Sequence, residues 1–164
     1  MPKTLTTKLV SLDQALTLRN KAREKKQSVV FTNGCFDLLH IGHIRYLTAA
    51  AVEGDILFVA INSDRSVRVL KGETRPLFPA SDRAELIAAF ECVDNVMIFD
   101  DLTADFLLEK LQPEVHAKGT DYTVETVPEL KIVQSYGGRI AIVGDSKDRS
   151  SAKIFERIQK KVGI

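Results

Sequence analysis

The sequence predicts an α/β fold: a single doubly wound (Rossmann-like) domain with a five-stranded parallel sheet. Short runs of β-branched and apolar residues alternate along the chain with segments of helical periodicity. This is the pattern of βαβ units joined by right-handed crossovers. One run, residues 56–61, is apolar throughout, as expected for a strand covered on both faces of a parallel sheet. The chain has 164 residues, 45% of them hydrophobic, which suits one domain with a substantial core.

The elements follow in order from periodicity and from turn and cap residues. Residues 1–10 are polar and predict a loose arm, and Ser11 can cap a helix over 11–26. Strands are expected at 29–31, 56–61, 93–99, 114–117 and 139–143. Helices are expected from Ile41, at 81–91 after a Ser81 cap, at 103–111, near Thr126 and Glu129 in capping-box spacing, and from Ser150 or Ser151. We therefore divide the chain into an N-terminal arm and helix, 1–27, and the domain proper, 28–164.

Two of these helices have predicted core-facing sides. The helix over 81–91 is expected to turn Leu86, Ile87 and Phe90 inward. The final helix is expected to bury Ile154, Phe155, Ile158 and Val162.

The stretch from Ser28 to Leu47 combines a strand, a glycine-bearing turn and a helix entry. His40 and His43 are three residues apart on the first helical turn, where unpaired backbone N–H groups and the helix dipole attract phosphate. Gly42 lets a ligand approach the backbone between them. The stretch predicts a polyphosphate site. A zinc site would need three or four ligands, but His116 is remote and the two cysteines form no CxxC pair.

Bulk properties exclude several classes of protein. The formal net charge of +1 gives no electrostatic case for binding nucleic acid or an anionic membrane. No apolar run reaches the roughly 20 residues of a membrane helix, and no segment resembles a signal peptide. Cys35 and Cys92 are too few for a disulfide framework. A soluble, cytoplasmic protein is expected.

Three further segments can contribute to an anion site. Residues 65–83 carry five cations, and Gly72, Pro76 and Pro79 oppose regular structure, so this segment is either a clamp on substrate anions or a solvated loop. Asn62 and Asp64 follow a strand. They either contact a ligand at its carboxyl end or serve as turn and helix-cap residues. A second phosphate-friendly turn lies at 118–122, and the hydroxyls of Ser150 and Ser151 lie near a helix start.

The segment GCFDLLHIGHIRYL resembles the signature of the nucleotidyltransferase superfamily, in which a G-x-F-D turn leads into H-x-G-H. The letters HIGH also occur in class I aminoacyl-tRNA synthetases, but the length and charge of this chain count against that class. Over roughly Ser28 to Ile158 the chain is similar to the heptose-1-phosphate adenylyltransferases. The matching motifs are VAINSD, LKGETRP, KGTDY and DRSSAKI. The departures are Thr120 for glycine, His116 before the lysine, and Ser-Ser-Ala for Ser-Thr-Thr.

This resemblance implies the strand order 3-2-1-4-5 and the stand-alone form of the enzyme, without a fused sugar kinase. It also implies the partners ATP and a sugar 1-phosphate, most closely heptose 1-phosphate, with ADP-sugar and pyrophosphate as products. Mg²⁺ bound mainly through the nucleotide phosphates is expected, and a homodimer is favoured. Alternatives are a cytidylyltransferase for glycerol 3-phosphate, ethanolamine phosphate or a similar alcohol phosphate, and a non-catalytic nucleotide sensor.

Site roles follow from the same motifs together with the need to neutralise phosphate charge. The expected catalytic residues are His40, His43, Lys71 and Arg75. The expected substrate-binding residues are Asp37, Arg75 and Arg83. The expected nucleotide-binding residues are Thr32, Asn33, Gly34, Cys35, Phe36, Gly42, Asn62, Asp64, Lys118, Gly119, Asp121, Tyr122, Ser150 and Ser151. The roles of Arg45 and His116 are left open.

Overall fold

A computed structural model describes residues 5–145 and 151–163, and it contains one five-stranded parallel sheet. The strand order is β3-β2-β1-β4-β5, so the predicted fold class and strand order are confirmed. The strands are β1 (Val29–Gly34), β2 (Ile56–Asn62), β3 (Asn95–Phe99), β4 (Val115–Gly119) and β5 (Arg139–Val143). The helices are α1 (Leu5–Lys8), α2 (Leu12–Glu24), α3 (Ile41–Ala51), α4 (Asp64–Lys71), α5 (Ala80–Ala88), α6 (Asp105–Leu111), α7 (Leu130–Ser135) and α8 (Ser151–Val162), with a 3-10 turn η1 (Val124–Thr126).

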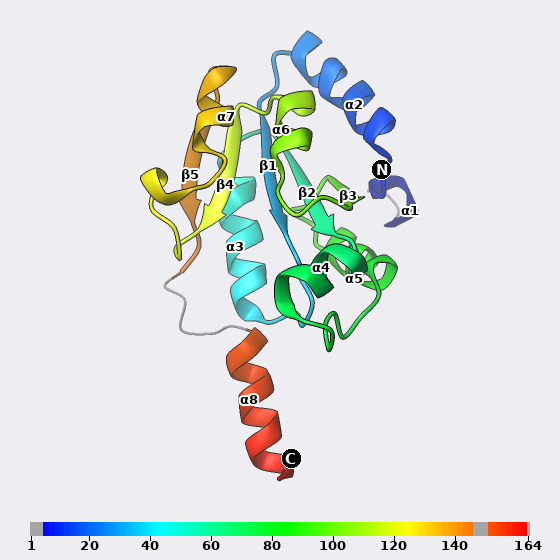
Figure 1. The fold of residues 1–164 in the computed structure, drawn as a ribbon. Helices are drawn as coiled ribbons and strands as arrows, with labels where there is room; N and C mark the ends of the chain where they lie inside the picture. Colours follow the sequence, from blue (N-terminus) through cyan, green and yellow to red (C-terminus); the bar gives the residue numbers. More distant parts are fainter. Residues whose placement is uncertain (1–4, 146–150, 164) are drawn as a thin grey trace.

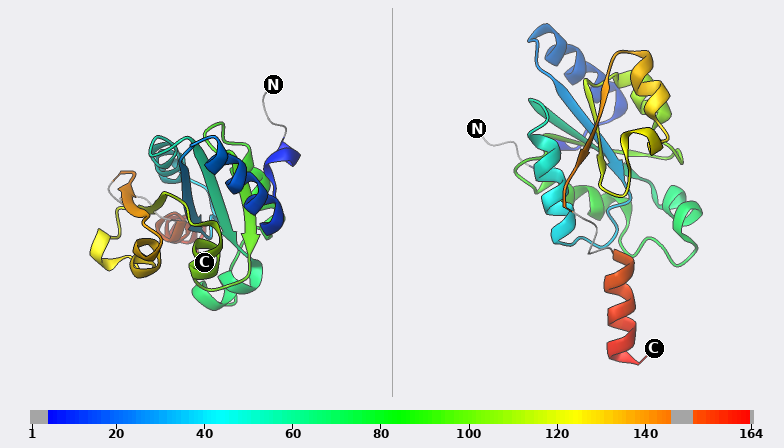
Figure 2. Two further views of the ribbon diagram at one scale, coloured as in Figure 1. Left: turned by 90° about the horizontal axis from the view of Figure 1, so that it is seen from above. Right: turned by 90° about the vertical axis from the view of Figure 1, so that its left-hand side faces the viewer.

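The sheet lies between two helical layers (Figures 1 and 2). Alternate residues of each strand point to opposite faces of the sheet, so each layer of helices packs against its own set of strand side chains. On one face Val30 and its neighbours pack against α3 and α5, with Leu47 and Ile87 fully buried. On the other face Phe31 and Phe58 pack against α2, α6 and α7. Covering both faces explains why the strands are nearly continuous apolar runs.

The N-terminal segment departs from the loose arm that its polar composition predicts. Residues 5–8 form α1, and Leu9 makes a parallel bridge with Val96 at the edge of the sheet. The Val10 N–H donates to the Val96 carbonyl at 2.9 Å, and the Lys8 ammonium donates to the Phe90 carbonyl at 2.9 Å. The prediction was wrong here because two apolar residues, Leu9 and Val10, and these two hydrogen bonds suffice to hold a polar segment at the edge of the sheet. The helix after it is confirmed, with Ser11 in a capping box.

Three predicted helix features are corrected. Helix α5 begins at Ala80 after Pro79, and the Ser81 hydroxyl binds Asp82 instead of capping the helix. The capping box near residue 126 pairs Thr123 with Thr126 on η1, and α7 begins only after Glu129. The basic segment is helical as far as Lys71, since α4 occupies its first part, and is irregular only over 72–79.

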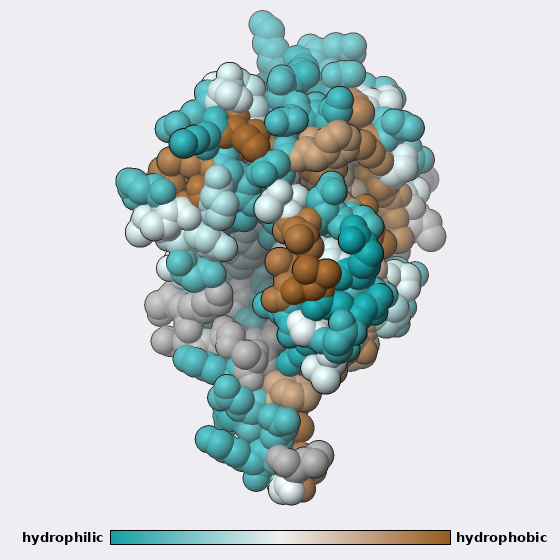
Figure 3. All heavy atoms as spheres, viewed as in Figure 1, coloured by the Kyte–Doolittle hydropathy of each residue, from teal (hydrophilic) through white to brown (hydrophobic). Residues whose placement is uncertain are grey.

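The predicted inward faces are also partly wrong. Leu86 is 45% exposed, whereas Ile87 is buried. Helix α8 extends away from the sheet (Figure 1), so Ile158 and Val162 remain 49% and 63% exposed. Apolar residues, coloured brown, gather along one side of α8 in Figure 3. Within the described ranges, none of the helices is both long and apolar enough to cross a membrane.

Candidate active site

A cavity of about 890 Å³ opens at the carboxyl ends of β1, β4 and β5, where ligands bind in open α/β sheets. The start of α3 and the end of α4 form other parts of its wall. Most of the predicted site residues line it, namely Asn33, Gly34, Cys35, Phe36, Asp37, His40, Gly42, His43, Asn62, Lys71, Arg75, Lys118, Gly119, Asp121 and Tyr122. Thr32, Asp64 and Arg83 lie outside the lining. Ser150 lies outside the described residues, and Ser151 is the first residue of α8.

The two histidines stand together at the start of α3. His40 is the N-cap, and its Nδ1 accepts the Gly42 N–H at 3.1 Å. The His43 Nδ1 accepts the His40 N–H at 3.2 Å, and the two rings lie 4.0 Å apart. Because each Nδ1 accepts a backbone hydrogen bond, each neutral ring carries its proton on Nε2. The pair therefore presents N–H donors to this corner of the pocket, beside the positive end of the helix dipole.

The turn between β1 and α3 is shaped by Phe36 and Asp37. Phe36 adopts a left-handed φ of 46°, and its ring lies 5.5 Å from that of His43. A Cβ at Gly34 would come within 3.0 Å of the Phe36 ring, so this position favours glycine. The buried Asp37 carboxylate accepts hydrogen bonds from Arg75 at 2.8 Å and from the Leu77 N–H at 2.6 Å. Asp37 thus fastens the 72–79 loop to the turn.

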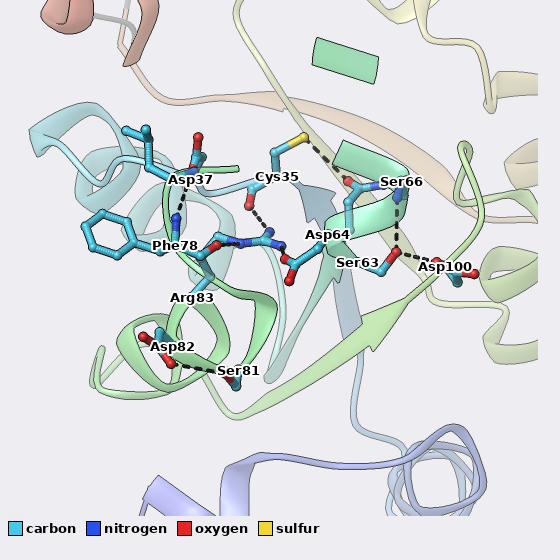
Figure 4. Close-up of polar contacts among 12 residues, drawn as sticks. Cys35, Asp37, Ser63, Asp64, Ser66, Phe78, Ser81, Asp82, Arg83 and Asp100 are labelled. Carbon is cyan, nitrogen blue, oxygen red and sulfur yellow. Dashed lines mark hydrogen bonds and ion pairs between the residues drawn. The ribbon is translucent and has the colours of Figure 1, made fainter. Parts of the chain in front are cut away.

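Arg83 organises the site from outside the pocket. Its side chain is fully buried, although an arginine offered to a substrate would be open to solvent. The guanidinium donates to the Cys35 carbonyl at 2.5 Å, the Phe78 carbonyl at 3.0 Å and the Asp64 carboxylate at 2.8 Å (Figure 4). These bonds join the β1–α3 turn, the 72–79 loop and α4. The contacts support a structural role for Arg83 in place of the predicted substrate contact.

The remaining cations line the opening. Lys71 ends α4 and is exposed. Arg75 is held by Asp37, and its guanidinium carbon lies 4.6 Å from the centre of the Phe155 ring on α8. Arg45, whose role was left open, pairs with Asp145 at 2.6 Å across the mouth, with both side chains 56% exposed. An exposed pair of this kind contributes little to stability.

Asn62 is the last residue of β2, and Asp64 is the first residue of α4, as in the helix-start alternative offered for it. Asn62 donates to the Ser66 hydroxyl at 3.0 Å, and Ser63 caps α4. Cys35 donates its thiol to the Asn62 amide oxygen at 3.9 Å. Burial raises the pKa of the Cys35 thiol above its usual value. Cys35 and Asn62 still line the pocket, whereas Asp64 serves Arg83.

The pocket around Lys118 contains two residues that the sequence analysis did not assign to the site, Glu129 and Tyr46. Lys118 donates to Asn33 at 3.2 Å and to Glu129 at 3.1 Å, and its nitrogen lies 5.4 Å from the centre of the Tyr122 ring. Tyr46 donates its hydroxyl to the Ala117 carbonyl at 2.9 Å. It also hydrogen-bonds Thr32, whose side chain is thereby turned into the protein. Glu129 and Tyr46 come from segments remote from Lys118, so no local motif could have revealed them.

A parallel sheet with this strand order, and a pair of N–H-donating histidines at a helix start facing lysines and arginines, define a nucleotidyltransferase-type domain. The chain belongs to the cytidylyltransferase-like family, whose sequence profile matches residues 31–158. It is 47% identical over 152 residues to the bifunctional protein HldE of Geotalea uraniireducens, covering 93% of this chain and 31% of that protein. It is 50% identical over 143 residues to HldE of Geobacter metallireducens, covering 87% of this chain and 29% of that protein. The chain therefore spans about a third of the length of these relatives.

Solved structures agree with the fold. The lipopolysaccharide core biosynthesis protein of Thermoplasma volcanium superposes with a TM-score of 0.62 at 25% identity, covering 74% of this chain and 99% of that one. The pantoate-β-alanine ligase of Francisella tularensis superposes with a TM-score of 0.60, covering 95% of this chain and 78% of that one. At 19% identity, the second match speaks for the fold alone.

Proposed function

We propose that the chain transfers AMP from ATP to a sugar 1-phosphate and releases pyrophosphate, and that its preferred sugar substrate is heptose 1-phosphate. The observation that carries this proposal is the pair of Nε2–H imidazoles at the start of α3, facing a pocket with Lys71, Arg75 and Lys118. The choice of sugar rests on the motifs shared with heptose-1-phosphate adenylyltransferases. The HldE relatives and the Thermoplasma volcanium protein named for lipopolysaccharide core biosynthesis support the same choice.

The reaction needs no general base, because the attacking sugar phosphate is already an anion at neutral pH. A phosphate oxygen of the sugar forms a bond to the α-phosphorus of ATP as the bond from that phosphorus to the bridging oxygen breaks. Pyrophosphate leaves with the electron pair. Catalysis then consists of aligning two polyanions and neutralising the charge that develops on the phosphates. His40 and His43 donate to the triphosphate, and the N-terminus of α3 adds its dipole.

The cations divide this work by position. Lys118 on the floor contacts the nucleotide, while Lys71 and Arg75 at the opening hold the sugar phosphate or the pyrophosphate. Asp37 and Arg83 do not contact substrate in this scheme. They hold the 72–79 loop and the β1–α3 turn in place through the hydrogen bonds described above.

Mg²⁺ would be held chiefly by the nucleotide phosphates. The Asp37 carboxylate already accepts three hydrogen bonds, and no group of three or more potential metal-ligating side chains comes together among residues 5–145 and 151–163. This donor set fits an ion that keeps its waters and binds through substrate oxygens. When bound, Mg²⁺ would neutralise phosphate charge at the transferred group.

The test is pyrophosphate release with Mg²⁺, crossing ATP, CTP and GTP against heptose 1-phosphate, glycerol 3-phosphate and ethanolamine phosphate. Release with ATP and heptose 1-phosphate alone is the expected result. Release with CTP and an alcohol phosphate would retain the chemistry and overturn the substrates. Nucleotide binding without release in any combination would support a nucleotide sensor instead. The His43→Ala variant, run in parallel, controls for contaminating pyrophosphate-releasing enzymes.

A further inference from the structure

A buried polar cluster lies directly behind Lys118. His116, two residues earlier on β4, is fully buried, and its Nε2 lies 3.7 Å from Oε2 of Glu129. The other carboxylate oxygen of Glu129 accepts the Lys118 ammonium. Lys118 and Glu129 line the pocket, whereas His116 lies behind the pocket wall. The cluster therefore runs from the nucleotide pocket to a histidine that solvent does not reach.

The tautomer of His116 follows from its other contact. Its Nδ1 lies 3.2 Å from the Phe31 carbonyl, and a carbonyl only accepts, so Nδ1 carries the proton. Burial lowers the pKa of His116, which keeps the ring neutral while the pocket is empty. A neutral ring then turns the Nε2 lone pair toward a carboxylate oxygen. Within the described part of the chain, neither His116 Nε2 nor Glu129 Oε2 has a hydrogen-bond partner.

Burying two hydrogen-bond acceptors, His116 Nε2 and Glu129 Oε2, against each other costs free energy. A proton between them would form a hydrogen bond and remove that cost. In the empty pocket, Lys118 balances the charge of Glu129, so that proton is not required. A nucleotide phosphate beside Lys118 adds negative charge to the same small volume. Added negative charge favours the charged form of a histidine. Protonated His116 can donate to Glu129 while Lys118 turns to the phosphate.

We propose that Glu129 is the positioning residue for Lys118, and that His116 takes up a proton from solvent when a nucleotide phosphate engages Lys118. The proposal rests on the nucleotide-binding role proposed above. It deepens that role by assigning two residues that act through Lys118. The charged groups that face His116 are Glu129, which precedes α7, and Lys118 on its own strand; β1 contributes the Phe31 carbonyl.

A double-mutant cycle tests the positioning role. The dissociation constant of Mg·ATP is measured by calorimetry for wild type, Glu129→Gln, Lys118→Gln and the double variant. We expect Glu129→Gln to weaken binding about tenfold, the scale of a charge-assisted hydrogen bond. In the Lys118→Gln background the same change should cost less than about twofold, because Glu129 acts through Lys118. Glu125→Gln is the matched control, since that carboxylate lies exposed on η1 in the same segment.

The pH dependence of affinity tests the proton. The His116→Asn variant keeps an N–H for the Phe31 carbonyl and removes the group that faces Glu129. Between pH 8 and pH 6, wild type should gain about threefold or more in Mg·ATP affinity relative to His116→Asn. The titration of ATP and of the other histidines is common to both proteins and cancels in this comparison.

Each remaining outcome has a definite meaning. Additive effects in the cycle, or a Glu125→Gln effect equal to that of Glu129→Gln, would overturn the positioning role. Parallel pH profiles for wild type and His116→Asn would overturn the proton uptake. If wild type itself fails to bind Mg·ATP, the proposed function fails and this inference fails with it. If wild type binds and the variants match it, only the inference fails.

Discussion

Replacing Arg83 by leucine should destabilise the domain before it affects any substrate contact. The guanidinium is fully buried and makes three hydrogen bonds, one of them to a carboxylate. Breaking a buried ion pair costs about 3–5 kcal/mol. The Asp64 side chain is 35% exposed and can be rehydrated, so the lower end applies. We expect a loss of about 3 kcal/mol, which for a domain of this size lowers Tm by roughly 6–12 °C.

The assay is urea unfolding followed by circular dichroism, with Arg65→Leu as the matched control. Arg65 pairs with Asp100 on the surface with its side chain 63% exposed, so its loss should leave the urea midpoint close to that of wild type. In the folded fraction of Arg83→Leu, kcat should fall because the β1–α3 turn has lost its anchor at Cys35. Unchanged stability and kcat, together with a KM for sugar phosphate raised tenfold or more, would refute this reasoning. That result would restore Arg83 as a substrate contact.

Three further variants probe other parts of the site. His43→Ala should lower kcat by about 100-fold or more, the scale for losing an electrostatic stabiliser; near-normal turnover in a folded variant would contradict the assignment. Asp37→Asn should cost about 2 kcal/mol in urea unfolding and speed trypsin cleavage after Lys71, because the 72–79 loop loses its anchor; equal cleavage rates would argue against that anchor. The pKa of His116 is lowered in the folded protein, so below about pH 6.5 the unfolded chain binds a proton at this ring more readily than the folded chain does. The free energy of unfolding therefore decreases as the pH falls. His116→Asn should lose less stability between pH 7.5 and pH 5.5 than wild type does, and equal losses would contradict this.

Glu129 also contributes to the loss of folding stability in acid, at lower pH than His116 does. Burial acts to raise its pKa, but the His116 ring, once acid has protonated it, and the Lys118 ammonium outweigh burial and bring the pKa to about 2. Since the folded pKa lies below the unfolded value, the carboxylate stabilises the fold above about pH 4.5. That contribution disappears as the pH falls toward 2.

The parts of the molecule that sequence could predict are those encoded locally. The strands are short apolar runs bounded by turns, and the His40–His43 turn is one contiguous motif at a helix start. The strand order could not be predicted in this way, because hydrophobic periodicity does not show which strands are neighbours in the sheet. It came from the resemblance to the nucleotidyltransferases, and the sheet confirms it.

What sequence could not predict depends on contacts between distant segments. A basic residue in a basic segment looks like a substrate contact, yet Arg83 points inward because two carbonyls and Asp64 surround it. Glu129 looked like a helix cap, and only the fold brings it to Lys118. An apolar stripe such as that of α8 indicates that one face of the helix can be buried, but it does not indicate what would cover that face.

The hydrogen bonds that hold the two imidazoles also determine which molecules could inhibit the enzyme. With each Nδ1 committed to a backbone N–H, a competitor meets only the protonated edge of either ring. A fragment with oxyanion, sulfone or nitro oxygens matches that edge. An amine or a hydroxyl that must donate does not, and a metal ion could coordinate either ring only after displacing the proton from Nε2. Screening libraries for this pocket should therefore be weighted toward compact acceptors with negative charge.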